Sequence, residues 1–265
     1  DVSGTAAIYN NLGSIYQEQG ELDQAASYYE KSLSLKLEIS EEETLIPTYN
    51  NMGNLCKIKG EWARAVVCYQ KALSIARKLR NLPAMAATFN NLGSICQNRG
   101  DMEGAITYYE KDLKISEEVG DRRAMANTYH NLGSLYQDRG EFDQATQYYE
   151  LSLGIKEELG DRRGIAATYN NLGSLCEARG EVGEAIDYYQ KSLAIKHEIG
   201  DFYGLAFTLN NLGMVHAGVG NYERAVKLIS QSRKIFEQVG DKERAAAAVE
   251  NLKRVQNVKG GTKND

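Results

Sequence analysis

Apolar residues recur along this chain at the three- and four-residue spacing of amphipathic helices, and the pattern repeats every forty residues. In a representative unit, residues 121–160, Asp121 is a good N-cap, and Gly140 and Gly160 end two helices. The first helix has its apolar positions at Ala126, Tyr129, Leu132, Leu135 and Tyr136. Those of the second are Phe142, Ala145, Tyr149, Leu153, Ile155 and Leu159. Each unit is therefore predicted to be a helical hairpin.

The forty-residue period runs through the chain without an insertion or a deletion, and such a period indicates a solenoid. We predict an all-α fold with one solenoid domain over residues 1–259. Its hairpins are expected at residues 1–40, 41–80, 81–120, 121–160, 161–200 and 201–240. Residues 241–258 form a seventh first-type helix, which we interpret as a cap because lysine (Lys253) replaces its glycine. Residues 260–265 are expected to be a flexible tail.

Three residues inside the predicted helices need a special explanation. Gly133 and its equivalents cost each first helix about 1 kcal/mol relative to alanine, which predicts a close approach of the second helix near Ala145. Pro47 lies too deep for a first helical turn, so the first helix of the second repeat is expected to begin late. Pro83 lies nearer the start of its helix and should be tolerated.

This pattern resembles the tetratricopeptide repeat family. The family carries an aromatic residue, a Leu-Gly pair and a tyrosine on the first helix, and an alanine and an aromatic residue on the second. The matching residues of the first repeat are Tyr9, Leu12, Gly13, Tyr16, Ala25 and Tyr29. The forty-residue period resembles the subclass of the Leu-Gly-Asn-repeat adaptors and kinesin light chain. The resemblance implies a right-handed α-α superhelix whose concave groove is lined by the first helix of each hairpin.

Composition argues against several classes of function. The net charge of −5 disfavours nucleic-acid binding, and no apolar run approaches the length of a membrane span. The three histidines occupy unrelated repeat positions, and the common catalytic, nucleotide and metal motifs are absent. We therefore predict that the chain is not an enzyme and uses no cofactor or metal. The chain begins with Asp1 rather than methionine, so we expect an excised segment or a processed product.

The cysteines and the doubled tyrosines are assigned structural roles. The four cysteines are interpreted as small buried residues with free thiols, which favours a cytoplasmic location. Doubled tyrosines such as Tyr148 and Tyr149 are assigned to the core, the first half-buried and the second buried.

The candidate site is the face of the first helices that points away from the hairpin partner, and it is rich in carboxamides. One column is invariant: Asn11, Asn51, Asn91, Asn131, Asn171, Asn211 and Asn251. A second runs beside it: Asn10, Asn50, Asn90, His130, Asn170 and Asn210. One turn further on, Gln97 and Gln137 share this face, and Arg123 and Arg163 begin it. This surface is predicted to be polar and nearly uncharged.

Two interpretations of the asparagines stay open. A carboxamide both donates and accepts, so a ladder of them can hold the backbone of an extended peptide. Tetratricopeptide relatives use asparagine ladders in this way, and the resemblance implies the same here. Alternatively, the asparagines fix the angle between repeats, or repeat duplication copied them. Arg123 and Arg163 either meet an acidic residue of a partner or pair with Asp121 and Asp161 or solvent.

The leading functional hypothesis is a protein-interaction scaffold that binds an extended peptide in the concave groove. One alternative is a sensor domain of a larger signalling protein, switched by a peptide or small effector. The other is a structural spacer or self-assembling array, joined end to end through the N-terminal repeat, where Ile8 replaces a threonine. The expected partner is a protein or peptide, with no nucleic acid and no membrane.

Overall fold

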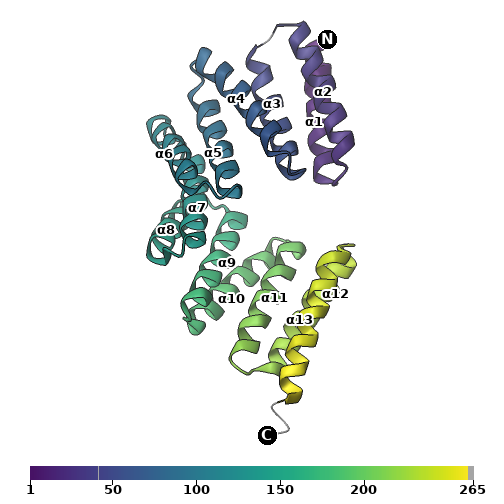
Figure 1. Cartoon of the computed structure of the whole chain (residues 1–265), viewed down its shortest axis with the longest axis vertical. Coiled ribbons are helices and arrows are strands. Elements are labelled where there is room, and N and C mark those ends of the chain that lie inside the picture. The colour runs from purple at the N-terminus through teal and green to yellow at the C-terminus, as the bar shows by residue number, and fades with distance from the viewer. Residues whose placement is uncertain (41, 262–265) are drawn as a thin grey trace. The chain divides into compact units, whose positions relative to one another are not determined.

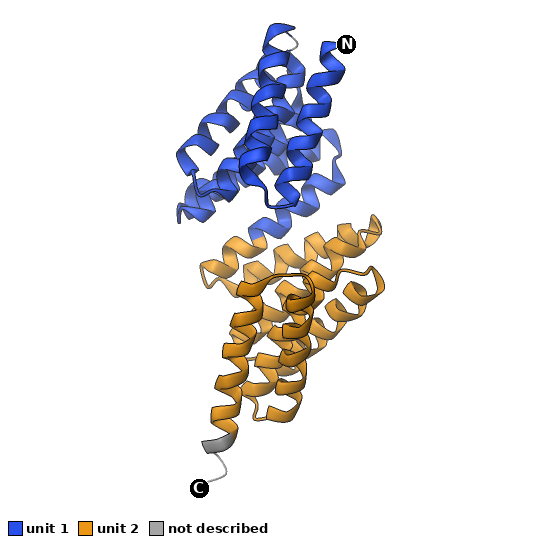
Figure 2. Cartoon of the chain, turned by 90° about the vertical axis from the view of Figure 1, so that its right-hand side faces the viewer, with its two compact units in different colours: residues 1–132 blue, residues 133–265 orange. Residues whose placement is uncertain are grey.

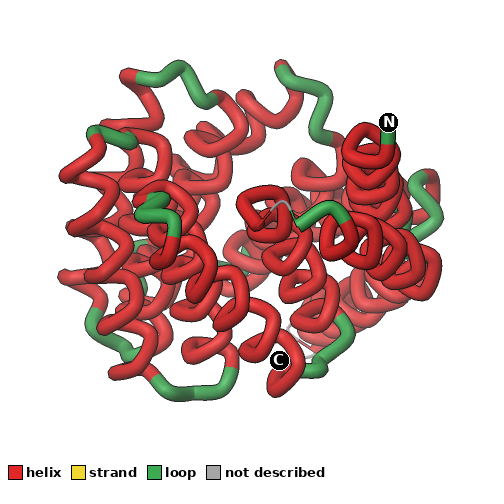
Figure 3. Tube along the Cα trace, turned by 90° about the horizontal axis from the view of Figure 1, so that it is seen from above, coloured by secondary structure: helices red, strands yellow, loops and turns green. Residues whose placement is uncertain are grey.

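The computed structural model describes residues 1–40 and 42–261, which form thirteen helices joined by short loops (Figures 1 and 3). The helices are α1 (Val2–Glu18), α2 (Leu22–Glu38), α3 (Glu42–Ile58), α4 (Trp62–Lys78), α5 (Leu82–Asn98), α6 (Met102–Val119), α7 (Arg122–Asp138), α8 (Phe142–Glu158), α9 (Arg162–Arg179), α10 (Val182–Glu198), α11 (Phe202–Gly218), α12 (Tyr222–Gln238) and α13 (Lys242–Gly261). They pack as antiparallel pairs followed by one extra helix. The all-α prediction of six hairpins with a C-terminal helix is confirmed.

The chain divides into two compact units, residues 1–132 and 133–265, with the boundary inside α7 (Figure 2). In the first unit, each hairpin contacts the next through α2 and α3 and through α4 and α5. In the second, α8 contacts α9 and α10 contacts α11. The single solenoid domain over residues 1–259 concerns both units together and stays a prediction. At the C-terminal end α13 continues to Gly261, two residues into the predicted tail, and residues 262–265 lie outside the described part.

The helix ends follow the signals in the sequence. The Asp121 carboxylate caps α7, because its Oδ1 atom accepts the backbone N–H of Ala124 at 2.9 Å. Gly120 ends α6 with a φ of 71°, in the left-handed region. Arg80 and Ser40 take φ values of 52° and 54° at the same repeat position, where a side chain costs about 1–2 kcal/mol. The junction therefore keeps its geometry even where glycine is missing.

The expected late start of the helix containing Pro47 is wrong. Helix α3 begins at Glu42 and continues through the proline, which is exposed. Proline removes one backbone hydrogen bond, worth about 0.5–1.5 kcal/mol net. Leu45 and Ile46 are buried on the same turns, and burying each stabilises the helix by about 1.5–3 kcal/mol. Pro83 lies in the first turn of α5, as expected.

The first five hairpins are each centred on a contact between a glycine and a tyrosine ring, and in the sixth Ile229 takes the place of the ring at Gly213. A Cβ atom at Gly133 would lie 2.6 Å from a ring carbon of Tyr149, so close approach explains the glycine. The group that approaches is this ring rather than Ala145 or the backbone, which corrects the sequence expectation. The second tyrosine of each doublet is buried: Tyr29, Tyr109, Tyr149 and Tyr189. The first is half-buried, and Tyr148 stacks on Tyr136 with ring centroids 5.2 Å apart.

The cysteines are free thiols, as expected. Cys56 and Cys176 are buried, whereas Cys68 and Cys96 are half-buried. Cys56 and Cys68 lie near enough across the α3–α4 hairpin to influence each other's pKa, a proximity that sequence spacing did not reveal. Burial raises the pKa of both thiols, so both are protonated at neutral pH.

Two further findings bear on the predicted partners. No helix in the described part of the chain is long and apolar enough to cross a bilayer. Ile8 is 59% exposed on α1, at the position where the threonines of later repeats are buried. Self-association through this end of the chain stays a prediction.

The glycine–ring contact predicts opposite effects for two glycine substitutions. Gly133→Ala should lower the free energy of unfolding by about 1–3 kcal/mol, because the new methyl group overlaps the Tyr149 ring. Gly154→Ala on α8 is the matched control, since nothing lies within 4 Å of its added Cβ atom. That change should stabilise the chain by up to about 1 kcal/mol through helix propensity. Urea unfolding followed by circular dichroism measures both, and equal effects would contradict the packing argument.

Candidate peptide-binding face and acidic pocket

The first helices of successive hairpins lie side by side within each unit. In unit 1, α1 contacts α3 and α3 contacts α5, and in unit 2 α9 contacts α11 and α11 contacts α13. The asparagine columns follow these helices. Asn11 is exposed, and the other asparagines of both columns are half-buried. Each unit therefore carries its own amide-rich face.

The column that begins at Asn10 has a structural role. The Oδ1 atom of Asn50 accepts the hydroxyl proton of Thr88 at 3.3 Å, and that of Asn170 accepts from Thr208 at 2.8 Å. Each threonine belongs to the following repeat and is fully buried. These bonds tie neighbouring hairpins together, so the inter-repeat interpretation holds for this column.

The invariant column is only partly used inside the protein. The Nδ2 atoms of Asn51, Asn131 and Asn251 donate to the Oδ1 atoms of three asparagines of the preceding repeats, at 3.1–3.3 Å: Asn10, Asn90 and Asn210. Asn171 contacts the Tyr149 hydroxyl. The carboxamides of Asn11, Asn91 and Asn211 make no hydrogen bond to any described residue. The invariant column therefore keeps acceptors and donors available on the surface.

Two glutamines of the predicted peptide-binding face, Gln97 and Gln137, accept hydrogen bonds from buried tyrosines, and their contact with a ligand stays a prediction. The hydroxyl of Tyr109 donates to Oε1 of Gln97 at 3.1 Å, and the hydroxyl of Tyr149 donates to Oε1 of Gln137 at 3.0 Å. Gln137 also donates to the Ser174 hydroxyl at 3.3 Å. These bonds satisfy buried phenols, a role that the sequence analysis missed. The signal was the constant twelve-residue spacing between the glutamine and tyrosine positions.

Arg123 and Arg163 lie exposed at the start of the face, and no ion-pair partner for either occurs among residues 1–40 and 42–261. The alternative pairing with Asp161 is not seen, because that carboxylate caps α9 through the N–H of Gly164. Arg162 pairs with Glu198 on α10.

A pocket of about 220 Å³ opens in unit 1 between α5, α6 and α7. Its lining consists of two carboxylates, three carboxamides and three small apolar side chains: Asp112, Asp121, Asn90, Asn91, Asn127, Pro83, Ala87 and Ala124. Asn91 also belongs to the amide-rich face, so the pocket opens on that face. No sequence pattern described above pointed to this pocket.

Asp112 is the unusual member of this pocket. It is 1% exposed, and its carboxylate accepts hydrogen bonds from Asn90 Nδ2 at 2.9 Å, Ser116 Oγ at 3.0 Å and the Thr128 hydroxyl. Burial raises the pKa of this carboxyl, and the hydrogen bonds oppose the shift. No cation among the described residues contacts it, and its charged neighbour is Asp121.

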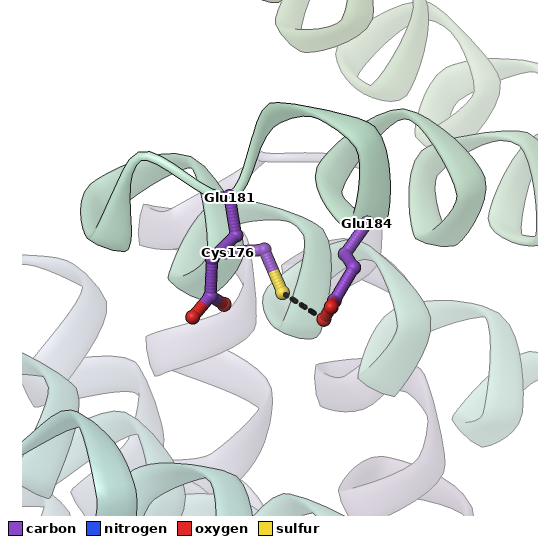
Figure 4. A group of neighbouring side chains, drawn as sticks. All are labelled: Cys176, Glu181 and Glu184. Carbon is purple, nitrogen blue, oxygen red and sulfur yellow. Dashed lines mark hydrogen bonds between the residues drawn. The ribbon is translucent and has the colours of Figure 1, made fainter.

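A second cluster brings Cys176 together with Glu181 and Glu184, with potential ligand atoms within 4.8 Å of one another (Figure 4). The thiol lies 3.9 Å from a Glu184 oxygen. Burial and the two carboxylates raise the pKa of Cys176 to about 11, so the thiol keeps its proton at neutral pH. Glu181 already pairs with Arg179 at 2.9 Å. This arrangement therefore does not favour a metal ion.

These features define a helical repeat scaffold with a polar face. Models of the tetratricopeptide repeat match residues 4–81, 84–158, 125–198 and 206–239. The matches span most of the sequence, and the chain belongs to the tetratricopeptide repeat family. The family is generally a protein–protein interaction module and typically non-catalytic. The resemblance drawn from Tyr9, Leu12 and Gly13 is confirmed. A search of curated proteins found no match.

Several solved structures share the fold. BtubC (BKLC) from P. vanneervenii is 24% identical, with a TM-score of 0.64 and coverage of 92% of both chains. A Rap protein complexed with competence and sporulation factor is 14% identical, with a TM-score of 0.72 over 96% of this chain and 75% of that one. A signal-transduction ATPase with a tetratricopeptide repeat sensor, from Pyrococcus horikoshii, is 16% identical, with a TM-score of 0.74 over 95% of this chain and 38% of that one.

Because Asn90 is hydrogen-bonded inside the protein and Asn91 is not, alanine substitutions at these two neighbouring positions should differ in their effect on stability. Asn90→Ala removes the amide that bonds to Asp112, Thr128 and Asn131, and should lower the free energy of unfolding by about 1–3 kcal/mol. Asn91→Ala removes no internal hydrogen bond and should change it by less than about 0.5 kcal/mol. Urea midpoints of the two variants provide the comparison. Equal losses would show that both columns are structural.

The buried carboxyl predicts a pH dependence of stability. Because the pKa of Asp112 is higher in the folded chain than its ordinary value of 3.8, the folded state retains this proton longer. Its contribution to the free energy of unfolding therefore falls as the pH rises from about 3.8 through the folded pKa. Asp112→Asn should raise the urea midpoint at about pH 7, and the gain should shrink toward about pH 4. The exposed Asp187→Asn is the control, and a pH-independent gain would contradict this account.

Proposed function

We propose that the chain is a protein-interaction module that binds an extended peptide segment along its amide-rich faces. The observation that carries the proposal is the division between the two asparagine columns. Every asparagine of the column that begins at Asn10 is bonded to a neighbouring hairpin, whereas the invariant column leaves whole carboxamides at Asn91 and Asn211 unbonded. A carboxamide pairs with both the N–H and the C=O of a peptide backbone, so binding requires no particular side chain at those positions.

The energetics favour modest affinity. Each amide contact contributes about 0.5–1.5 kcal/mol net, and ordering a flexible segment costs about 2–5 kcal/mol. Four or five contacts therefore barely offset the ordering cost. Tight binding requires side-chain pockets or charges in addition, and the exposed guanidinium groups of Arg123 and Arg163 supply charge at the start of the face.

The test uses a peptide selected from a displayed decapeptide library against the complete chain. The double variant Asn91→Ala with Asn211→Ala should weaken its binding about tenfold or more in calorimetry, with the helical circular dichroism unchanged. Gln70→Ala with Gln147→Ala is the matched control, because it removes two exposed amides from second helices, one in each unit. Unchanged affinity in the asparagine variant would contradict the proposal that these carboxamides bind the peptide.

A sensor role within a larger signalling protein is the second candidate. It is favoured by the likeness to a Rap protein complexed with competence and sporulation factor and to an ATPase with a tetratricopeptide repeat sensor. A sensor must change shape when its ligand binds. Small-angle scattering of the chain with and without the selected peptide separates this role from a rigid scaffold, which would scatter alike in both states.

A further inference from the structure

Three hairpin junctions in this chain contain a buried lysine, at Lys36, Lys156 and Lys196, whereas Ala76 and Phe236 occupy the same repeat position at two others. At the α8–α9 junction Lys156 is 4% exposed, and its ammonium donates to the Thr168 hydroxyl at 3.0 Å. Burial lowers the pKa of Lys156 to about 8, and the nearby Asp161 carboxylate opposes this shift. Lys196 makes the same bond to Thr208 at 2.6 Å at the next junction.

A backbone carbonyl completes this ammonium site. Lys196 donates to the carbonyl oxygen of Gly204 at 3.2 Å. In unit 1, Lys36 donates at 2.8 Å to the carbonyl of Thr44 and at 2.7 Å to the hydroxyl of Thr48. The common site thus consists of a threonine hydroxyl, a carbonyl one turn earlier and, at the junctions that begin at Asp161 and Asp201, a capping aspartate.

The α6–α7 junction has the same acceptors but no lysine. Ser116 occupies the lysine position, eighty residues before Lys196. Asp112 occupies the position of Ser192, which elsewhere donates to a backbone carbonyl. Ser116 and Asp112 therefore change the formal charge at these two repeat positions from positive to negative. The pocket described above opens at this junction, lined by Asp112, Asp121 and Ala124, the residue equivalent to Gly204.

We propose that this pocket binds the ammonium group of a lysine side chain from an extended peptide. The Asp112 carboxylate has about four acceptor sites and receives three internal hydrogen bonds, which leaves capacity for a guest donor. Asp121 adds a second negative charge, and the apolar side chains of Pro83 and Ala87 provide contact for the methylene stem. This inference rests on the proposed function, because Asn91 forms both a wall of the pocket and part of the peptide-binding face.

Lysine fits this pocket better than arginine. The equivalent acceptors at the other junctions are arranged around a compact ammonium group, which directs three donors at a hydroxyl and a carbonyl. A planar guanidinium instead favours two parallel bonds to one carboxylate. Both oxygens of Asp112 already accept hydrogen bonds, so its carboxylate does not present the two free oxygens that a guanidinium would pair with.

The test is an NMR titration of the complete chain with the capped peptide Ala-Ala-Lys-Ala-Ala. Its norleucine counterpart has the same stem without the charge. We expect the lysine peptide to bind about tenfold more tightly or better, with saturable amide shifts at Asp112, Asp121 and Ala124. n-Butylammonium and spermidine form separate arms, which show whether a free amine fills the pocket equally well.

Two variants test whether the charge of Asp112 causes the preference for the lysine peptide. Asp112→Asn keeps the shape of the side chain and removes its charge, and it should reduce the preference for lysine over norleucine to about twofold or less. Asp112→Ser combined with Ser116→Lys restores the side chains of the sister junctions and therefore should fold. Its own lysine should occupy the site and abolish saturable binding of the lysine peptide. Equal binding of both peptides, or lysine preference that survives both variants, would overturn the proposal.

The outcomes distinguish the pocket from the ladder. If both peptides bind equally and Asn91→Ala with Asn211→Ala weakens both, the ladder stands and the lysine pocket is wrong. If n-butylammonium binds in a manner that depends on Asp112 but neither peptide binds more tightly than the amine, the pocket accepts free amines. That result would overturn the peptide-lysine proposal and count against the proposed function.

Discussion

The contact between a helix-interior glycine and a tyrosine ring sets the geometry on which the remaining structure depends. At Gly133 there is no space for a methyl group, so the two helices of the hairpin pack at the distance that the Tyr149 ring permits. The same ring carries its hydroxyl to the polar face, where Gln137 accepts its proton. One residue therefore fixes the core and orients a side chain of the candidate binding surface.

The asparagines show how a repeated residue divides into two roles. Asn50 and Asn170 accept hydrogen bonds from fully buried threonine hydroxyls of the next hairpin, which also donate to backbone carbonyls one turn earlier. Their neighbours in the invariant column face no such demand at Asn91 and Asn211. Copying during repeat duplication explains why both columns recur, whereas hydrogen bonding between hairpins explains why every asparagine of the column that begins at Asn10 is bonded internally.

Local patterns made the hairpins, the caps and the buried tyrosines predictable, because each depends on residues within about two turns. The partner of Gly133 was misassigned, since the alanine and the tyrosine of the second helix both lie near it. Pro47 was misjudged, because burial of Leu45 and Ile46 outweighed a local rule. Which asparagines are bonded depends on contacts between residues about forty positions apart, and sequence spacing alone does not supply those distances.

The departure at Asp112 and Ser116 was visible in the sequence, but its meaning required Lys156 and Lys196 to be seen in place. A row of identical carboxamides binds a peptide backbone equally well in any register, because each carboxamide offers the same donor and acceptor. A single junction with reversed charge breaks that equivalence. If a lysine enters there, it fixes which peptide residue lies against Asn91, so a surface that recognises only backbone gains a register and a preference for sequence.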